Sequence, residues 1–353
     1  MVAAFCLGAI VGSFLNVCIY RIPRGISFVK PPRSFCPHCE RTIPWQQNIP
    51  LLSWLFLRGR CGHCGKPIGW RYPIVELLTA ILFAKAASLI TFPALPSVLV
   101  FLSLLVVVTF IDLEFFLIPD LLSKGGLAAG LALSLLTPEL HHTSSALTAI
   151  GRAATGALCG ALILYLVTEL GKLAFGRYKV SFSTSTRFSF EPASEGDPKI
   201  LIDGQAFTWS EHFFRKSDRI LVRADEVTLN GTQSKNLDLN FYFDRIVTNR
   251  ETIPLVDVVN LSGRMQYAEF PREAMGLGDV KLIAAMGTFT GWQGVLFTIP
   301  AASVIGAAFG LTALAFRKRE WSAKIPFGPY LAVGGIIWLF WGHQFLSWYM
   351  GLL

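Results

Sequence analysis

The chain has 353 residues, of which 53% are hydrophobic and 15% charged, and its formal net charge is +8. Soluble domains carry roughly a quarter charged residues, so this composition excludes an ordinary soluble protein and indicates a surface that faces lipid. The net charge does not indicate nucleic-acid binding, because lysines and arginines gather in short segments between apolar runs. We therefore expect membrane lipid, and no nucleic acid, among the partners.

Several apolar runs approach the length of about 20 residues that a helix needs to cross a bilayer. Eight such spans are predicted, at roughly 2–20, 73–92, 97–113, 121–137, 147–170, 279–293, 294–316 and 328–349. The division between the sixth and seventh spans falls at residues 291–294. The first span carries Gly8 and Gly12, a spacing that lets another helix approach closely.

The distribution of basic residues predicts the orientation of these spans. Lysines and arginines are frequent in 21–72, 172–179 and 317–324, whereas the connection 138–146 contains none. If the spans alternate in direction, all the basic segments fall on one side, which is the cytoplasmic side by the positive-inside rule. We expect a multi-pass protein of the cell (inner) membrane with its N-terminus outside.

Four of the seven cysteines form two CxxC pairs in the first basic loop: Cys36, Cys39, Cys61 and Cys64. Two such pairs, 21 residues apart, can bring four thiolates onto one tetrahedral zinc ion. A redox dithiol or spare cysteines are the alternatives. The loop is small and polar, so a structural zinc would supply much of its folding free energy. His38 and His63 lie inside the knuckles and are expected at the surface, since four sulfurs complete the coordination.

Residues 176–270 depart from the apolar pattern, with alternating, β-branched and aromatic segments between turn residues, and predict a β-rich soluble insert. An accessory or docking role is expected, and an unspecified binding function is the alternative. The predicted fold class is an all-α polytopic membrane protein with a zinc-knuckle loop and this insert. Its parts are a first transmembrane helix (1–20), the zinc loop (21–72), helices two to five (73–175), the insert (176–270) and helices six to eight (271–353).

Two aspartates are predicted at the same membrane edge. Asp112 closes the third span and Asp279 opens the sixth, and the derived topology places both on the cytoplasmic side. Ionisable residues at such positions indicate function. Two adjacent carboxyl groups share one proton, so one acts as a base toward water and the other as an acid toward a leaving amide nitrogen. Gly276 and Gly278 leave room for an extended substrate backbone.

The alternative interpretation is that these aspartates are helix caps or solvated loop charges. Glu114 and Asp120 are assigned to that class, with Asp120 a candidate N-cap for the fourth span. Lys281 belongs to the predicted substrate approach. It either extends toward the membrane interface or balances charge near Asp279.

Several stretches of the sequence match the motifs of a known protein family and occur in the same order. They are Gly12-Ser-Phe-Leu-Asn-Val17, the two CxxC pairs, 48–54, Arg71-Tyr-Pro-Ile-Val-Glu-Leu77, 111–112 with 117–120, Gly276-Leu-Gly-Asp279-Val-Lys281 and Pro326-Phe-Gly-Pro-Tyr330. Together they resemble the prepilin peptidase (type IV leader peptidase) family of GxGD membrane aspartyl proteases, over nearly the whole chain except 176–270. The segment Leu-Glu-Phe-Phe after Asp112 and the insert depart from that pattern.

The resemblance implies cleavage of the basic cytoplasmic leader of type IV prepilins or type II secretion pseudopilins. It implies Asp112 and Asp279 as the catalytic pair. For bifunctional members it also implies N-methylation of the new N-terminus with S-adenosylmethionine, associated with the cysteine loop, although no residues that bind this cofactor are identified. The alternatives are a peptidase without methyltransferase activity, a non-catalytic assembly protein of the secretion or pilus apparatus, and a transporter or channel. No internal repeat favours the last.

Overall fold

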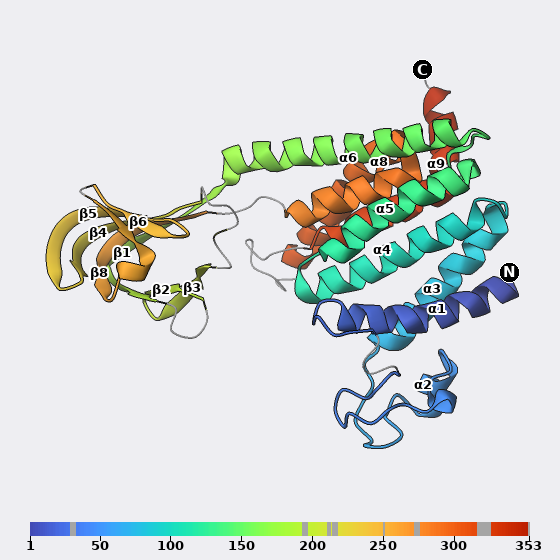
Figure 1. The fold of residues 1–353 in the computed structure, drawn as a ribbon, viewed down its shortest axis with the longest axis horizontal. Helices are drawn as coiled ribbons and strands as arrows, with labels where there is room; N and C mark the ends of the chain where they lie inside the picture. Colours follow the sequence, from blue (N-terminus) through green and yellow to red (C-terminus); the bar gives the residue numbers. More distant parts are fainter. Residues whose placement is uncertain are drawn as a thin grey trace. The chain divides into compact units, whose positions relative to one another are not determined.

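The computed structural model describes residues 1–28, 33–192, 197–209, 213, 218–249, 251–271, 276–315 and 326–351. It contains two compact units, a helical unit formed by Met1–Tyr165 with Gly276–Leu353 and a second unit formed by Leu166–Met275. Figure 1 traces both units in the colours of the sequence. The predicted basic segment 317–324 lies outside the described residues.

The helical unit is built from long apolar helices. They are α1 (Val2–Arg21), α3 (Arg71–Leu89), α4 (Leu95–Phe115), α5 (Asp120–Leu136), α6 (Ala146–Phe175), α8 (Leu277–Ala315) and α9 (Gly328–Met350). Residues of α6 from Leu166 onward belong to the second unit. Shorter elements are α2 (Leu52–Phe56) and the 3-10 turns Trp45–Gln47 and Pro138–His141. Among the described residues, five helices are long and apolar enough to cross a membrane, namely α1, α3, α4, α6 and α8. The helical, membrane-like character predicted from the composition is therefore confirmed.

The predicted sixth and seventh spans occur together in α8, which extends over 39 residues. Gly291 interrupts the helical geometry with φ 67° and ψ 179°. A side chain is strained at such positive φ, whereas glycine adopts it readily. The break falls within the segment where the sequence predicts the two spans to divide.

Close packing of α1 against α3 depends on the two glycines of the first helix. A Cβ atom on Gly8 would lie 2.7 Å from the Cα of Ala80, and one on Gly12 would lie 2.8 Å from the Cα of Glu76. The two backbones therefore touch, as small-residue spacing allows in membranes. By contrast, Ile10 and Phe14 on α1 are exposed, as expected for side chains that face lipid.

The second unit contains an eight-stranded sheet, which confirms that the chain carries a β-rich insert. Its strands are β1 (Arg177–Glu191), β2 (Lys199–Ile202), β3 (Gln205–Thr208), β4 (Ile220–Leu229), β5 (Thr232–Phe241), β6 (Arg245–Val247), β7 (Thr252–Pro254) and β8 (Leu261–Pro271). The strand order is β3-β2-β1-β8-β4-β5-β6-β7, and these neighbouring strands pair in antiparallel fashion. The hydrophobic core of the insert includes Phe188, Trp209 and Phe241.

The first and last strands of the insert lie side by side in the sheet. Residue Arg177 at the start of β1 is paired with Pro271 at the end of β8. The chain therefore enters and leaves the sheet at neighbouring positions.

Candidate peptidase site and cysteine cluster

The four cysteines of the CxxC pairs converge in the loop between α1 and α3. Their sulfur atoms all lie within 4.8 Å of one another, and the Sγ atoms of Cys36 and Cys64 are 3.9 Å apart. All four are free thiols. Four sulfurs bound tetrahedrally at about 2.3 Å from zinc would be separated by about 3.8 Å. The donor set and its spacing therefore fit a single zinc ion.

The two knuckles have the same backbone structure. The N–H of Cys36 donates to the carbonyl of Arg41, and the N–H of Cys61 donates in the same way to Lys66. The closing residue of each turn has positive φ, 57° at Glu40 and 68° at Gly65. Each knuckle thus presents its cysteines in the same geometry, as a shared metal requires.

The second knuckle lowers the pKa of one of its thiols and raises the pKa of the other, Cys64, to about 11. Backbone N–H groups of Cys64 and His63 lower the pKa of the Cys61 thiol to about 7. Both His38 and His63 are exposed, as predicted, and neither belongs to the four-sulfur cluster.

Asp112 is buried near the end of α4, where it is 5% exposed. Its Oδ2 accepts a hydrogen bond of 2.9 Å from the backbone N–H of Gly328, the first residue of α9. Exposed backbone N–H groups and the helix dipole at a helix N-terminus stabilise negative charge. The start of α9 therefore fixes one carboxylate oxygen and leaves Oδ1 for other partners.

Asp279 lies in the first turn of α8 and is 9% exposed. Its Oδ1 is buried and has no hydrogen-bond partner among the described residues. The carboxyl group of Asp112 is close enough to act on it electrostatically. Because buried polar atoms are normally paired, this oxygen is available to a proton, a water molecule or a substrate.

Ile118 connects the surroundings of the two aspartates. A Cβ atom on Gly278 would lie 3.2 Å from its Cβ, and one on Gly328 would lie 3.4 Å from its Cδ1. The segment after α4 therefore packs against the beginnings of both α8 and α9. A Cβ on Gly276 would lie 3.7 Å from Oδ2 of Asp279, which is ordinary contact.

Lys281, which the sequence predicts near Asp279, forms its ion pair with a different carboxylate. The Nζ atom of Lys281 is 2.6 Å from Oδ1 of Asp120, and Lys124 lies 2.8 Å from Oδ2 of the same carboxylate. Asp120 is the first residue of α5, whose N-cap is Pro119, so the interpretation of Asp120 as an N-cap is wrong. Its side chain instead joins α5 to α8.

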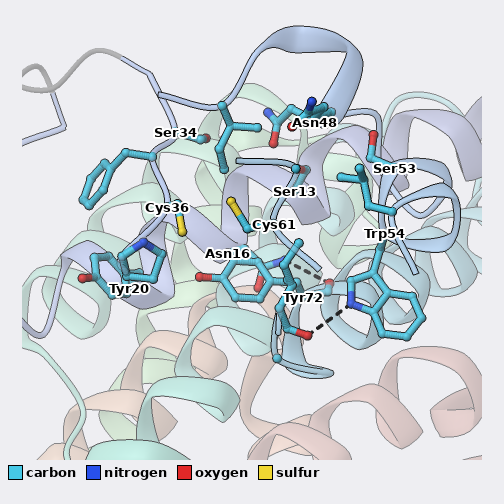
Figure 2. A pocket seen from close by; sticks show the side chains of 18 of the residues that line it. Ser13, Asn16, Tyr20, Ser34, Cys36, Asn48, Ser53, Trp54, Cys61 and Tyr72 are labelled. Atoms are coloured by element: carbon cyan, nitrogen blue, oxygen red, sulfur yellow. Dashed lines mark hydrogen bonds between the residues drawn. The ribbon is translucent and has the colours of Figure 1, made fainter. Parts of the chain in front are cut away.

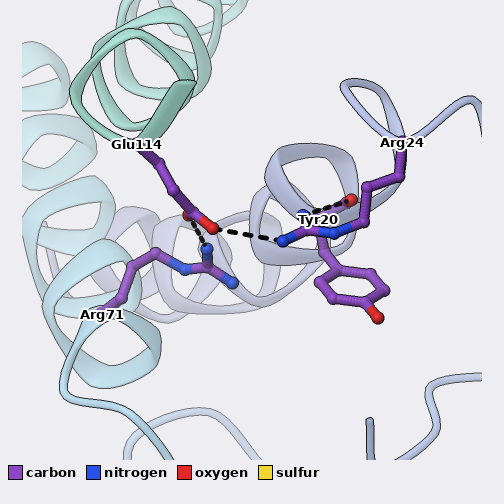
Figure 3. A network of polar contacts seen from close by, with 4 residues as sticks. All are labelled: Tyr20, Arg24, Arg71 and Glu114. Carbon is purple, nitrogen blue, oxygen red and sulfur yellow. Dashed lines mark hydrogen bonds and ion pairs between the residues drawn. The ribbon is translucent and has the colours of Figure 1, made fainter. Parts of the chain in front are cut away.

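Glu114 was assigned from sequence to a solvated loop, but the structure places it in an ion-pair network (Figure 3). Its carboxylate binds Arg71 at the start of α3 and Arg24 just beyond α1, the latter at 3.3 Å. The guanidinium of Arg24 also lies over the ring of Tyr20. Glu114 therefore ties the two ends of the cysteine loop to the helix that carries Asp112.

A cavity of about 210 Å³ lies between α1, the cysteine loop and α3 (Figure 2). Its lining includes Asn16, Trp54, Tyr72 and Glu76, together with Cys36 and Cys61 of the cluster. Sequence reasoning missed this cavity, because its lining includes three separate segments, 12–17, 48–54 and 71–77, whose motifs do not indicate that they converge in space. The isolated glutamate in the apolar run of α3 was the available signal.

The architecture is thus that of a membrane protein with a four-thiol cluster and two buried aspartates in neighbouring helices. A family model for the bacterial peptidase A24 N-terminal domain matches residues 6–90. The model of the type IV leader peptidase family matches residues 99–201 and 258–311. The chain belongs to this type IV leader peptidase family.

Individual relatives agree with the family models. A prepilin leader peptidase/N-methyltransferase of Aeromonas hydrophila is 30% identical over an alignment of 370 positions, gaps included, that covers 98% of this chain and 92% of the relative. A protein of the same description from Stutzerimonas stutzeri is 28% identical over 99% of this chain and 93% of its own length. One from Myxococcus xanthus is 50% identical over 132 residues, 37% of this chain and 39% of the relative. No solved structure matches.

Proposed function

We propose that this chain is an aspartyl endopeptidase that removes the basic leader of type IV prepilins or type II secretion pseudopilins and methylates the new N-terminus. The observation that carries the peptidase proposal is the buried pair of carboxyl groups of Asp112 and Asp279. The relatives named prepilin leader peptidase/N-methyltransferase, which align along nearly the whole chain, support both activities.

The environments of the two aspartates support separate roles in peptide hydrolysis. The N–H of Gly328 stabilises negative charge on Asp112, so Asp112 is assigned as the base. Asp279, with an unpartnered oxygen, is assigned as the acid. Asp112 takes a proton from a water molecule, and the oxygen of that water attacks the peptide carbonyl carbon. Asp279 then gives its proton to the amide nitrogen as the C–N bond breaks.

The approach to this pair is assigned to the first turn of α8. Gly276 and Gly278 leave space for an extended peptide beside Asp279, and Lys281 lies at the edge of that path. We place the site at the cytoplasmic face of the inner membrane with the N-terminus outside, because a basic leader is cytoplasmic and the basic loops predict the same side.

For methylation, S-adenosylmethionine when bound supplies an electrophilic methyl group to the amine. The cavity beside the cysteine cluster is assigned as the place that holds it, with Trp54 and Tyr72 as apolar walls. The zinc held by the four cysteines is assigned a structural role, since four sulfurs leave no open coordination position.

The peptidase proposal is tested with Asp112→Asn and Asp279→Asn in the full chain, co-expressed with a prepilin from the same genome. Each change is expected to abolish the gel shift that reports leader removal, while membrane insertion persists. Asp203→Asn is the matched control, because Asp203 has φ 50° in the turn between β2 and β3, a conformation that asparagine also tolerates. Full processing by either of the first two variants would refute the proposal.

Mass spectrometry of the processed product tests the methyltransferase activity separately. The mass of the N-terminal fragment is expected to rise by one CH2 unit, because a methyl group replaces a hydrogen of the amine. An unmodified amine in the presence of ample S-adenosylmethionine would show that the chain is a peptidase without methyltransferase activity.

A further inference from the structure

The cavity between α1, the cysteine loop and α3 contains a buried acidic residue. Glu76 is 8% exposed and lines this cavity. Its Oε2 accepts a hydrogen bond of 2.7 Å from the backbone N–H of Leu51. In the described part of the chain, no lysine, arginine or histidine forms an ion pair with it. A buried carboxylate without a cation is unfavourable unless another group compensates its charge.

The loop segment that contacts Glu76 has a strained backbone. Leu51 has φ 62° and ψ −50°, and the N–H of Leu52 donates to the carbonyl of Pro50 across it at 2.6 Å. This is a γ-turn with positive φ, which is rare for residues other than glycine. Such strain is concentrated at ligand sites, where the surroundings impose it. Here it directs the Leu51 N–H at the carboxylate of Glu76.

A second buried polar residue of the cavity, Asn16, has one side-chain atom without a hydrogen-bond partner among the described residues. Asn16 is 2% exposed, and its Nδ2 donates to the carbonyl of Tyr72 at 3.0 Å. Its Oδ1 is buried and unpartnered among the described residues. Leaving a buried acceptor without a hydrogen bond is unfavourable, so a ligand that donates a hydrogen bond there would remove a penalty. Figure 2 shows Asn16 and Tyr72 together with the aromatic side chains of Tyr20 and Trp54.

We infer that this cavity binds an organic cation, with Glu76 as its counter-ion and the side-chain oxygen of Asn16 as a hydrogen-bond acceptor. The inference rests on the proposed methyltransferase activity, whose reactants include two cations, the sulfonium of S-adenosylmethionine and the protonated peptide amine. We assign Glu76 to the sulfonium. A weakly hydrated cation suits a cavity with the rings of Tyr20, Trp54 and Tyr72, and aromatic faces attract such cations. The amino groups of the same ligand can donate to Asn16. Glu76 is thus a positioning residue for the methyl donor.

The test compares ligands that differ in one charge. Binding of S-adenosylmethionine and of its neutral thioether product S-adenosylhomocysteine is measured by calorimetry on the detergent-solubilised, zinc-loaded full chain. The variant Glu76→Gln is expected to bind S-adenosylmethionine about tenfold more weakly, which corresponds to about 1.4 kcal/mol. It is expected to bind S-adenosylhomocysteine as the unaltered chain does. Glu139→Gln, an exposed glutamate in the turn Pro138–His141, is the matched control and should change neither affinity.

Retained prepilin cleavage by Glu76→Gln verifies its folding, because Glu76 belongs to no part of the assigned peptidase pair. Should cleavage be lost, the milder Glu76→Asp variant, which keeps the charge, is measured in its place and is expected to retain a preference for the sulfonium. Equal weakening of both ligands, or no weakening, overturns the assignment of Glu76.

Two further arms separate this inference from the proposed function. A short peptide is offered with a free or an acetylated N-terminal amine. If Glu76→Gln weakens binding of the free-amine peptide and leaves the affinity for S-adenosylmethionine unchanged, the cation is the peptide amine and the sulfonium assignment is wrong. If the unaltered chain binds neither S-adenosylmethionine nor its product, the methyltransferase proposal itself fails, whereas peptidase activity is untouched.

Discussion

The backbone N–H of Gly328 lies 2.9 Å from Oδ2 of Asp112, so the first residue of α9 holds one oxygen of a buried carboxylate in α4. The two residues are 216 positions apart in the sequence. A Cβ atom on residue 328 would lie 2.7 Å from the same oxygen, so a larger residue there would have to displace the carboxylate. The end of one helix thus sets the position of a proposed catalytic group in another.

Gly328→Ala is therefore expected to lower the rate of leader cleavage at least tenfold, because the added methyl group displaces the Asp112 carboxylate. A tenfold loss corresponds to about 1.4 kcal/mol of transition-state stabilisation. The measurement is a time course of prepilin processing with the purified chain. Gly125→Ala in α5 is the control, since a Cβ there meets nothing within 4 Å. Equal rates for the two variants would argue against this role of Gly328.

Removal of metal is expected to unfold the cysteine loop and spare the helices. A zinc-binding chelator, or Cys36→Ser, should abolish the bound zinc measured by mass spectrometry and make the loop sensitive to limited proteolysis near residues 36–64. The reason is that the loop has few buried apolar residues, so the metal supplies much of its stability. Cys159→Ser in α6 lies outside the four-sulfur cluster and should keep full zinc content. Zinc retained after loss of Cys36 would contradict the four-thiol site.

His141 is expected to make stability depend on pH. It is 5% exposed, and its Nε2 lies 3.0 Å from both the Ser134 hydroxyl and the Thr288 carbonyl. Burial lowers the pKa of His141 below its ordinary value. The histidine contribution to stability is therefore fully present above about pH 6.5 and is lost as pH falls through the lower pKa of the folded state.

The melting temperature in detergent at pH 8 and at pH 5.5 measures this effect. The drop between the two conditions should be smaller for His141→Gln than for the unaltered chain, because glutamine does not titrate. His343→Gln in α9, at an exposed position, serves as the control and should leave the drop unchanged. An identical drop in all three proteins would exclude His141 as its source.

The contact between α1 and α3 gives a prediction of stability. Gly8→Ala and Gly12→Ala place a methyl group at 2.7 Å and 2.8 Å from the backbone of α3, so each should destabilise the chain by about 1–3 kcal/mol. In α6, Gly151→Ala meets nothing within 4 Å and should be neutral or slightly stabilising, since alanine is the better helix former. Chemical denaturation in detergent distinguishes these outcomes. An unchanged free energy of unfolding for Gly8→Ala would mean that α1 and α3 can move apart without a loss of stability.

Much of the architecture followed from local patterns. The apolar runs predicted the long helices, the alternating segments 176–270 predicted the sheet, and the CxxC spacing predicted the four-sulfur cluster. These features depend on residues that are close in sequence, or on cysteines whose chemistry restricts their partners. The break at Gly291 was also visible, because glycine clusters punctuate helices.

The sequence did not reveal contacts made by common residues that are distant along the chain. Glu114 has an unremarkable sequence context, and only the folded chain brings Arg24 and Arg71 to it. Asp120 looked like a helix cap, and its lysine partner from α8 could not be inferred from spacing. The roles of Asp112 and Asp279 remain a prediction that their burial supports and that the substitutions above will test.

The pairing of Arg177 with Pro271 has an evolutionary consequence. A module whose two ends are neighbours can be lost, gained or replaced without altering the distance that the flanking helices must bridge. The family models leave residues 202–257 unmatched, which lie within this module. A laboratory exchange of residues 177–271 for a short linker would therefore test whether the helical unit folds without the sheet.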